Sequence, residues 1–336
     1  MRFGIFDHMD RSGEPLSAQY ESRLKILEAC DAAGFYSYHL AEHHGTPLGL
    51  APSPSVFLSS VAQRTKRLRL GALVFTLSLY HPLRLIDEIC MLDHLSKGRL
   101  DVGLGRGISP IELGFYGVDP AQAPDIYAEV SAIILQGLQT NSLTYEGRHF
   151  SFRDVPIELS PVQKPIPLWY GVGNVESAQR AAQNGINIIC NGPPQGVRKL
   201  TDAYRVARPD DGASAPFIGM SRHMVIAETD SEARDLAREG CAQWLSNLLL
   251  LWRKHNVKPT LAFPATFDEA DAMGVCLVGT ASTVRDKLRK QADEAGINYI
   301  LCRLAFGNLP MDASLRTVRL VRDEIMPAFA PSLPVV

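Results

Sequence analysis

The sequence has little of what marks a nucleic-acid-binding protein or a membrane protein. Its 336 residues include 34 lysines and arginines against 36 aspartates and glutamates, so the formal net charge is -2. Without a basic surplus, nucleic-acid binding by phosphate neutralisation is excluded. The densest apolar run covers only residues 248–252, far short of the roughly 20 residues that cross a bilayer. We therefore expect neither a nucleic-acid partner nor a membrane partner.

Signals for export and for disulfide formation are also missing. The first ten residues lack a cationic segment followed by a long apolar stretch, so we do not expect a secretory signal. The six cysteines are widely spaced and form no C-x-x-C pair. In a chain of this length, such cysteines are typically reduced and buried. These features predict a cytoplasmic protein.

The same order of helix, glycine and strand occurs three times along the chain. Apolar residues recur at helical steps before Gly34, Gly185 and Gly296, and a β-favouring run follows each glycine. The predicted helices are 17–33, 177–184 and 280–295, and the strands after them are 35–40, 186–190 and 297–304. Further strands are predicted at 2–6, 68–76, 99–104, 167–172 and 223–227, with a helix at 82–97. Strands that alternate with helices in this way predict a parallel α/β sheet.

Two parallel folds fit this alternation, an open dinucleotide-binding sheet and a closed (β/α)8 TIM barrel. The open sheet needs a G-x-G-x-x-G turn after its first strand, but residues 7–10 hold no glycine. The run 103–107 is similar but has Ile108 where the last glycine is required. Polar residues follow many of the strands, as in a site built from the strand ends of a barrel. We predict a single TIM-barrel domain over 1–336, with an insertion at 243–278 between strands 7 and 8, where the connection is longer than one helix needs.

The tripeptide Glu42-His43-His44 follows the second predicted strand. Metal-dependent barrel hydrolases place two histidines at alternate strand positions, so that both point to one ion. These histidines are adjacent and would point to opposite faces, which argues against a metal site. At a strand end they are candidates for an acid, a base or a hydrogen-bond donor near neutral pH, as is His81. The alternative is an ordinary loop with one solvated and one packed histidine.

Two glycine-containing turns are candidates for contact with a phosphate group. At Gly105 and Arg106 the backbone can approach a ligand closely and a guanidinium group can hold an anion. Gly173, Asn174 and Ser177 lie between a predicted strand and a helix N-terminus, a common place for phosphate. Either feature alone is also explained by a strand end or an ordinary helix cap.

Together these segments resemble the bacterial luciferase-like flavin-dependent monooxygenases. The resemblance rests on Glu42-His43-His44, the segment from Gly71 to His81-Pro82, the run LDHLSKGR at 92–99, and Gly105-Arg106-Gly107. It extends over nearly the whole chain, from Arg2 to the last helix before Pro327. For the fold, the resemblance implies a (β/α)8 barrel, usually dimeric, with an insertion late in the chain.

The resemblance also implies a cofactor and its contacts. Family members bind reduced FMN, or in one branch the deazaflavin F420, at the C-terminal end of the barrel. The implied catalytic residues are His43, His44 and His81, and the active-site histidine of the family matches His43. The implied cofactor-binding residues are Phe6, Leu73, Val74, Gly105, Arg106, Gly173, Asn174 and Ser177. The peptide bond between Leu73 and Val74 is expected to be cis, and no metal ligand is implied.

Two positions depart from the family pattern. Gly105 stands where the luciferase α-subunit has a cysteine near the reactive flavin carbon. A second phosphate-binding arginine is common at the start of the helix after the fourth strand, but residues 121–125 read AQAPD and contain none. The phosphate is then held more weakly, or by other residues.

The implied function is the oxygenation of a small organic substrate by reduced FMN and O2. A separate flavin reductase would supply the reduced flavin, because this chain lacks a dinucleotide-binding motif, and a homodimer is expected. Three alternatives remain open at this point. They are F420-dependent hydride transfer on the same fold, a non-catalytic flavin-binding subunit, and a metal-dependent hydrolase barrel.

Overall fold

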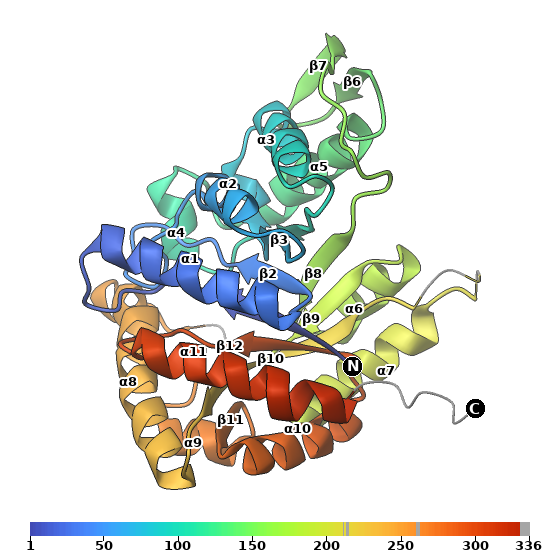
Figure 1. Cartoon of the computed structure of the whole chain (residues 1–336). Helices are drawn as coiled ribbons and strands as arrows, with labels where there is room; N and C mark the ends of the chain where they lie inside the picture. The colour runs from blue at the N-terminus through green and yellow to red at the C-terminus, as the bar shows by residue number, and fades with distance from the viewer. Residues whose placement is uncertain (211, 213–214, 260–262, 330–336) are drawn as a thin grey trace.

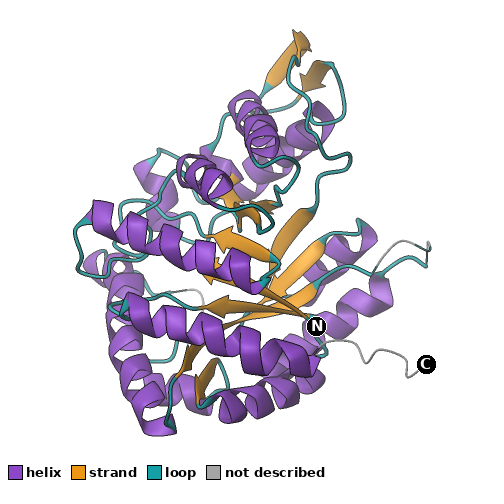
Figure 2. Ribbon diagram, in the orientation of Figure 1, coloured by secondary structure: helices purple, strands orange, loops and turns teal. Residues whose placement is uncertain are grey.

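The structure is a computed structural model that describes residues 1–210, 212, 215–259 and 263–329. Parallel strands form a nearly closed barrel with helices on its outside, which confirms the predicted α/β TIM-barrel fold (Figures 1 and 2). The barrel strands are β1 (Arg2–Asp7), β2 (Ser37–Leu40), β3 (Arg69–Ala72), β4 (Phe75–Thr76), β5 (Val102–Gly105), β8 (Leu168–Val172), β9 (Asn187–Cys190), β10 (Ile218–Ile226) and β12 (Tyr299–Arg303).

One interrupted strand closes the barrel. The hydrogen-bonded order of strands is β3-β2-β1-β12-β10-β9-β8-β5-β4, so it begins and ends with the two parts of segment 69–76. β3 pairs with β2, and β4 pairs with β5. The peptide bond between the two parts, Leu73–Val74, is cis, as the resemblance led us to expect. The single strand predicted at 68–76 is therefore two short strands.

The helices that follow the strands cover the barrel from outside (Figure 2). They are α1 (Leu16–Ala33), α2 (Pro54–Arg64), α3 (Pro82–Leu95), α4 (Pro110–Phe115), α5 (Ala123–Gly137), α6 (Val175–Gln183), α7 (Pro194–Ala207), α8 (Asp230–Lys254), α9 (Phe267–Ala272), α10 (Ala281–Ala295) and α11 (Met311–Leu320). Gly34 and Gly296 end their helices in the left-handed conformation, with φ of 85° and 65°, because glycine has no Cβ to oppose it. Within the described residues, no helix is long and apolar enough to cross a membrane.

The long connection between β10 and α10 contains α8, α9 and a further strand, β11 (Cys276–Gly279). Residue 243, where we expected the insertion to begin, lies inside α8, and residues 260–262 of the expected insertion are outside the described part of the chain. β10 is nine residues long and buried throughout. Its first half pairs with β9 and β12, and its second half pairs with β11. This one strand therefore joins the barrel to the added segment.

A β-hairpin, which the sequence analysis did not predict, projects from the barrel at the top of Figure 1. Its strands β6 (Ser142–Glu146) and β7 (Ser151–Pro156) pair only with each other. The Glu129 carboxylate of α5 accepts hydrogen bonds from the backbone N–H groups of residues 148–150 in its turn. Most of its side chains are exposed, so the hairpin lacks the apolar alternation by which half-buried strands are predicted.

Aromatic rings fill the N-terminal end of the barrel. The ring of Phe217 lies 4.8 Å from Tyr36, 5.1 Å from Tyr299 and 5.8 Å from Trp169, measured between ring centroids. In β1, a Cβ on Gly4 would lie only 1.9 Å from the Tyr299 hydroxyl oxygen, so the packing of the Tyr299 ring requires glycine at this residue. These rings pack against one another in the barrel interior at this end.

Candidate active site

The C-terminal ends of the barrel strands bring distant parts of the chain together, because all of these strands run parallel. β1 contributes Phe6 and is followed by His8, and β2 is followed by the segment 41–45. β12 ends at Arg303. Rings and charges from these strand ends contact one another, as described below. We call this end of the barrel the mouth.

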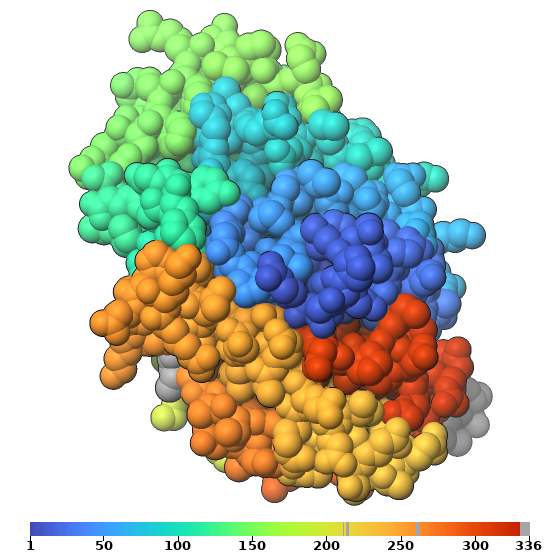
Figure 3. Space-filling model, turned by 90° about the vertical axis from the view of Figure 1, so that its left-hand side faces the viewer, coloured from blue at the N-terminus to red at the C-terminus, as the bar shows by residue number. Residues whose placement is uncertain are grey.

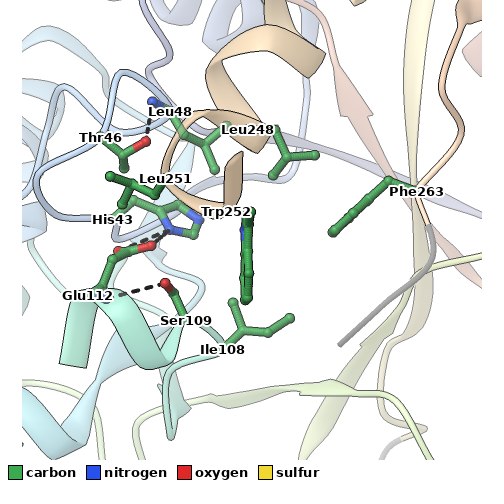
Figure 4. A pocket seen from close by; sticks show the side chains of 10 residues that line it. All are labelled: His43, Thr46, Leu48, Ile108, Ser109, Glu112, Leu248, Leu251, Trp252 and Phe263. Atoms are coloured by element: carbon green, nitrogen blue, oxygen red, sulfur yellow. Dashed lines mark hydrogen bonds and ion pairs between the residues drawn. The ribbon is translucent and has the colours of Figure 1, made fainter. Parts of the chain in front are cut away.

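His43 is held by a carboxylate at the mouth. Its Nδ1 lies 3.1 Å from Oε1 and 3.3 Å from Oε2 of Glu112, a residue of α4 (Figure 4). The backbone N–H of His44 donates to Glu112 Oε2 at 2.8 Å. Glu112 is in turn placed by Ser109, the N-cap of α4, whose hydroxyl accepts from the backbone N–H of Glu112. Two elements distant in sequence thus fix the orientation of the His43 ring.

The Glu112 carboxylate is kept in its charged form. Burial raises its pKa, but the hydrogen bonds from His43 and from the backbone of His44 outweigh burial, so the pKa lies below its usual value. A charged carboxylate at Nδ1 favours the tautomer in which this nitrogen carries the proton. The other ring nitrogen, Nε2, is then the one available for proton exchange with a ligand.

His44 points to a different set of partners. Its Nε2 lies 2.8 Å from Glu42 Oε1, and its Nδ1 lies 2.8 Å from the Tyr116 hydroxyl. The Glu42 side chain is fully buried, and its other oxygen accepts from the Thr76 backbone N–H and the Tyr80 hydroxyl, each at 3.0 Å. The adjacent histidines therefore separate as expected, and His44 fastens its loop to β4.

A mainly apolar pocket opens beside His43 (Figure 4). It is lined by His43, Thr46, Leu48, Ile108, Ser109, Glu112, Leu248, Leu251, Trp252 and Phe263. Leu251 and Trp252 of α8 pack with Ile111 of α4, and Figure 3 shows the yellow-to-orange α8 segment meeting the green surface around α4 on this face. The histidine and its carboxylate are the ionisable groups among these lining residues.

His8 continues the site toward the centre of the mouth. Its ring stacks on that of His43, with centroids 5.8 Å apart and planes at 29°. The Trp244 Nε1–H donates to His8 Nδ1 at 3.4 Å. Burial, and then the positive charge of Arg303, lowers the pKa of His8 well below its usual value. His8 is therefore neutral at physiological pH and adds no charge beside His43.

The expected cofactor residues occupy the same end of the barrel. Phe6, Leu73 and Val74 belong to an apolar cluster in the barrel interior that continues to the aromatic rings at the N-terminal end. Gly105 lies against the Val74 side chain, which a Cβ at position 105 would meet at 2.1 Å, so glycine is needed beside the cis bond. The exposed Arg106 side chain forms no ion pair within the described parts of the chain.

The turn after β8 has the expected helix cap. Asn174 is the N-cap of α6 and accepts from the Ser177 backbone N–H at 2.9 Å, while the Ser177 hydroxyl lies 3.4 Å from the Asn174 backbone nitrogen, which completes a capping box. Nothing lies within 4 Å of where a Cβ of Gly173 would be. β5 and β8 are paired neighbours, so this turn and Arg106 follow adjacent strands.

His81 is not brought into this group. Its exposed ring packs edge-on against Phe150 and Phe152 of the hairpin region, at centroid distances of 5.6 and 5.8 Å. It does not line the pocket beside His43. The expectation that His81 is catalytic is therefore not carried into the function proposed below.

Sequence reasoning missed Glu112, Trp244 and Arg303. Ser109-Pro110-Ile111-Glu112 fits the S-x-x-E capping-box pattern, and that signal was available. In a capping box the glutamate bonds back to its own helix start, whereas Glu112 bonds His43 and His44 instead. Arg303 and Trp244 carry no local signal, since the contacts of Arg303 with Phe6 and of Trp244 with His8 join residues 297 and 236 positions apart.

One buried group among the described residues has metal-ligand chemistry. A ligand atom from each of His223, Cys241 and Cys276 lies within 4.8 Å of the others. The pKa of the Cys241 thiol is raised by its hydrogen bond with Cys276 and by burial, so the thiol is neutral. The positive charge of Arg303 acts on both His223 and the cysteines. This positive charge would repel a bound metal cation. We therefore assign the three side chains to packing between α8 and the strands β10 and β11.

Comparison with known proteins identifies the relatives of this chain. The family model described as luciferase-like monooxygenase matches residues 1–299. The uncharacterized protein y4wF of Sinorhizobium fredii is 48% identical over 97% of this chain and 96% of its own length. The oxygenase component of the flavin-dependent trigonelline monooxygenase of Acinetobacter baylyi is 26% identical over 99% of this chain and 96% of its own length.

Solved structures agree with this assignment. Monooxygenase RslO1 of Streptomyces bottropensis superposes with a TM-score of 0.89, at 26% identity over 98% of this chain and 100% of its own. The oxygenating constituent of 3,6-diketocamphane monooxygenase from Pseudomonas putida, solved with FMN, gives 0.79 at 20% identity over 97% and 98% of the two chains. On these matches and the barrel described above, the chain belongs to the luciferase-like monooxygenase family of oxidoreductases.

Proposed function

We propose that the protein oxygenates a small, largely apolar organic substrate with reduced FMN and O2. The observation that carries this proposal is the His43–Glu112 pair, which faces an apolar pocket at the mouth of a barrel whose interior holds a cis peptide bond at Leu73–Val74. The relatives support it, since one is named as a flavin-dependent monooxygenase and another was solved with FMN.

The residues at the mouth fit a flavin nucleotide. Arg106 has no carboxylate partner among the ion pairs of the described residues and is free to bind a phosphate. Gly173 leaves open space beside the N-terminus of α6, where backbone N–H groups favour an anion. Phe6 and the Leu73–Val74 segment offer an apolar surface for a flat ring. We assign the phosphate to the turn and the ring to this surface.

The side chains of the chain have separate tasks in this proposal. When bound, the reduced flavin supplies the electrons that activate oxygen. His43 exchanges a proton through Nε2, and Glu112 keeps its ring in place through Nδ1. Leu248, Leu251 and Trp252 line the pocket and keep water from it. His44 holds the loop through Glu42 rather than reacting.

Two partners belong to the proposal. A separate flavin reductase is expected, because this chain has no dinucleotide-binding motif and a relative is named as an oxygenase component. A homodimer is expected from the family resemblance. Val56 of α2 and Met91 and Leu95 of α3, which are 70%, 54% and 42% exposed on packed helices, offer an apolar surface to a second copy. Sedimentation analysis of the purified protein measures the mass of the assembly.

Anaerobic titration tests the cofactor assignment. The purified protein is titrated with reduced FMN, reduced riboflavin and reduced F420, and binding is followed by calorimetry. We expect one FMN per chain, and tighter binding of FMN than of riboflavin, which lacks the phosphate. Arg106→Met should remove this preference, whereas the control Arg180→Met on the far part of α6 should not. If the protein binds reduced F420 but not reduced FMN, the proposed oxygenation is wrong and F420-dependent hydride transfer takes its place.

A coupled assay tests the reaction. With a flavin reductase, NADH and FMN present, apolar candidate substrates are screened for oxygen uptake beyond that of the reductase alone. A substrate-dependent uptake together with an oxygenated product in mass spectrometry supports the proposal. Flavin binding without such turnover on any substrate, and without any effect of His43→Ala, points to a non-catalytic flavin-binding subunit.

A further inference from the structure

Arg303 is a cation at the mouth that the site described so far does not use. It is the last residue of β12, and its guanidinium carbon lies 5.1 Å from the ring centre of Phe6 and 5.5 Å from that of Trp244. Its side chain is partly exposed. Stacking on rings occupies the faces of a guanidinium group and leaves the N–H groups at its edge free for hydrogen bonds.

The positive charge of Arg303 is not neutralised nearby. Within the described parts of the chain it forms no ion pair, and its Nε is buried without a hydrogen-bond partner. Its hydrogen bond to Asn191 Oδ1 is long, at 3.5 Å. Asp10 acts on Arg303 through space without forming an ion pair with it, and Asn247 and the backbone of residue 307 donate hydrogen bonds to Asp10 Oδ2.

Its neighbours do not supply a negative charge either. The Cys241 thiol, whose pKa is raised, stays neutral. His8 and His223 have pKa values lowered by burial and then by Arg303, so they are neutral as well. Burial lowers the pKa of Arg303 itself only to about 10, so it remains charged at neutral pH. A charged group that is so little solvated and so poorly paired gains most from a bound anion.

We propose that Arg303, together with Asn191, forms an anion-binding subsite at the mouth, which takes a planar, delocalised oxyanion edge. Two ligands have this chemistry. One is the N1 and C2-oxygen edge of the reduced flavin ring, which carries an extra negative charge that the oxidised ring lacks. The other is the carboxylate of a substrate. The first ligand rests on the proposed function, whereas the second does not.

Affinity for two oxidation states tests the flavin ligand. The dissociation constants of oxidised and of reduced FMN are measured anaerobically for the wild type, Arg303→Met and Arg303→Lys. Arg303→Met should weaken reduced FMN by on the order of tenfold more than oxidised FMN, the usual effect of a charge-assisted hydrogen bond. Arg303→Lys should restore part of the difference. Arg222→Met removes another buried arginine, one that bonds Gln291 beneath α10, and should leave the difference unchanged.

Carboxylate binding tests the second ligand in the flavin-free protein. Acetate and benzoate are titrated by calorimetry into the wild type and the same variants, with thermal unfolding as a check on folding. If Arg303→Met loses carboxylate binding but keeps the difference in affinity between reduced and oxidised FMN, the subsite binds the substrate rather than the flavin. A wild type that binds no flavin while Arg303 still governs benzoate binding refutes the proposed function and supports the subsite. If Arg303→Met changes neither measurement, the subsite does not exist.

Discussion

The two ends of the barrel use the same residue types for opposite purposes. At the N-terminal end, His39 of β2 packs edge-on against Trp169 at 4.7 Å and shares a 3.2 Å hydrogen bond with the Tyr299 hydroxyl. At the mouth, His43 is bound to a carboxylate and faces a pocket. The first histidine is completely buried, and the second remains accessible to a ligand. Histidine is thus a packing residue at one end, whereas at the other it faces a pocket, where we propose that it carries a proton.

Charged groups show the same contrast. Asp101, at the N-terminal end, accepts hydrogen bonds from Arg69 at 2.9 Å and Ser37 at 2.8 Å, so both of its oxygens are occupied. Arg303 and Arg106 at the mouth lack such partners among the described residues. Satisfied polar groups stabilise the fold, whereas incompletely paired ones cost stability and are available to ligands. Substitutions at the mouth should therefore mainly reduce activity, and substitutions at the N-terminal end of the barrel should mainly reduce stability.

The largest effect on activity is expected for His43→Ala. Removal of a general acid or base typically costs on the order of 10²–10⁴-fold in turnover. The free energy of unfolding should change little, because His43 is a partly accessible loop residue beside a pocket. Turnover in the coupled assay and urea unfolding measure the two quantities on the same preparation.

His44→Ala is the matched control for this variant. His44 is the neighbouring histidine but bonds Glu42 and Tyr116, so its loss should reduce turnover less. If His44→Ala proves the more damaging change, the catalytic role belongs to His44. If neither variant loses activity, neither His43 nor His44 takes part in catalysis, and the proposed difference between the two ends is wrong at this position.

The largest effect on stability is expected for Trp169→Ala. This side chain is 1% exposed and packs against Phe217 and Tyr299, and removal of a buried tryptophan typically costs about 3–5 kcal/mol. The turnover of the fraction that remains folded should be close to that of the wild type. Trp169→Phe keeps most of the volume and should cost less. A variant that stays stable but loses its activity would show that the N-terminal end contributes to the chemistry.

A smaller effect on activity is expected for Glu112. Glu112→Ala removes the acceptor at His43 Nδ1 and should lower turnover by roughly tenfold to a hundredfold, less than loss of the histidine itself. Glu112→Gln keeps an oxygen that can accept from Nδ1 and should recover part of the rate. Flavin affinity should be unchanged in both variants. A loss that appears only in KM would assign Glu112 to substrate binding rather than to positioning.

The smallest expected effect is on the pH dependence of stability, and it arises from His39 at the N-terminal end of the barrel. Burial, and then the charge of Arg69, lowers the pKa of His39 from 6.5 to about 3. As the pH falls below 6.5, the unfolded chain binds the proton first, so the stability contributed by neutral His39 is complete above 6.5 and is lost progressively toward 3. Between pH 6.5 and 5, His39→Gln should reduce the slope of unfolding free energy against pH by up to about 1.4 kcal/mol per pH unit.

His8 and His223 should leave part of this slope in place, because their pKa values are also lowered. Urea unfolding at a series of pH values measures the slope. An equal slope in wild type and His39→Gln would mean that His39 does not differ in its protonation between the folded and unfolded chain.

The sequence predicted the barrel because its signals are local. Helical spacing, a terminal glycine and a β-favouring run each involve neighbouring residues, and their alternation fixes the parallel topology. The cis bond at Leu73–Val74 was predictable from the motifs that resemble the family, and so was the position of His43 at the mouth. Glu112 was not predicted, because its side chain leaves the cap that its sequence position suggests. Arg303 was missed because only the folded barrel brings it to Phe6 and Trp244.

The position of α8 has a consequence for how this enzyme can change in evolution. Trp244, Leu248, Leu251 and Trp252 are spaced by four, seven and eight residues, which places them along one side of a single helix, over His8 and the pocket. This helix is the next element after β10, and its apolar residues pack against β10 and β11. A few substitutions along that side can therefore reshape the pocket beside His43 while the barrel and the His43–Glu112 pair stay unchanged.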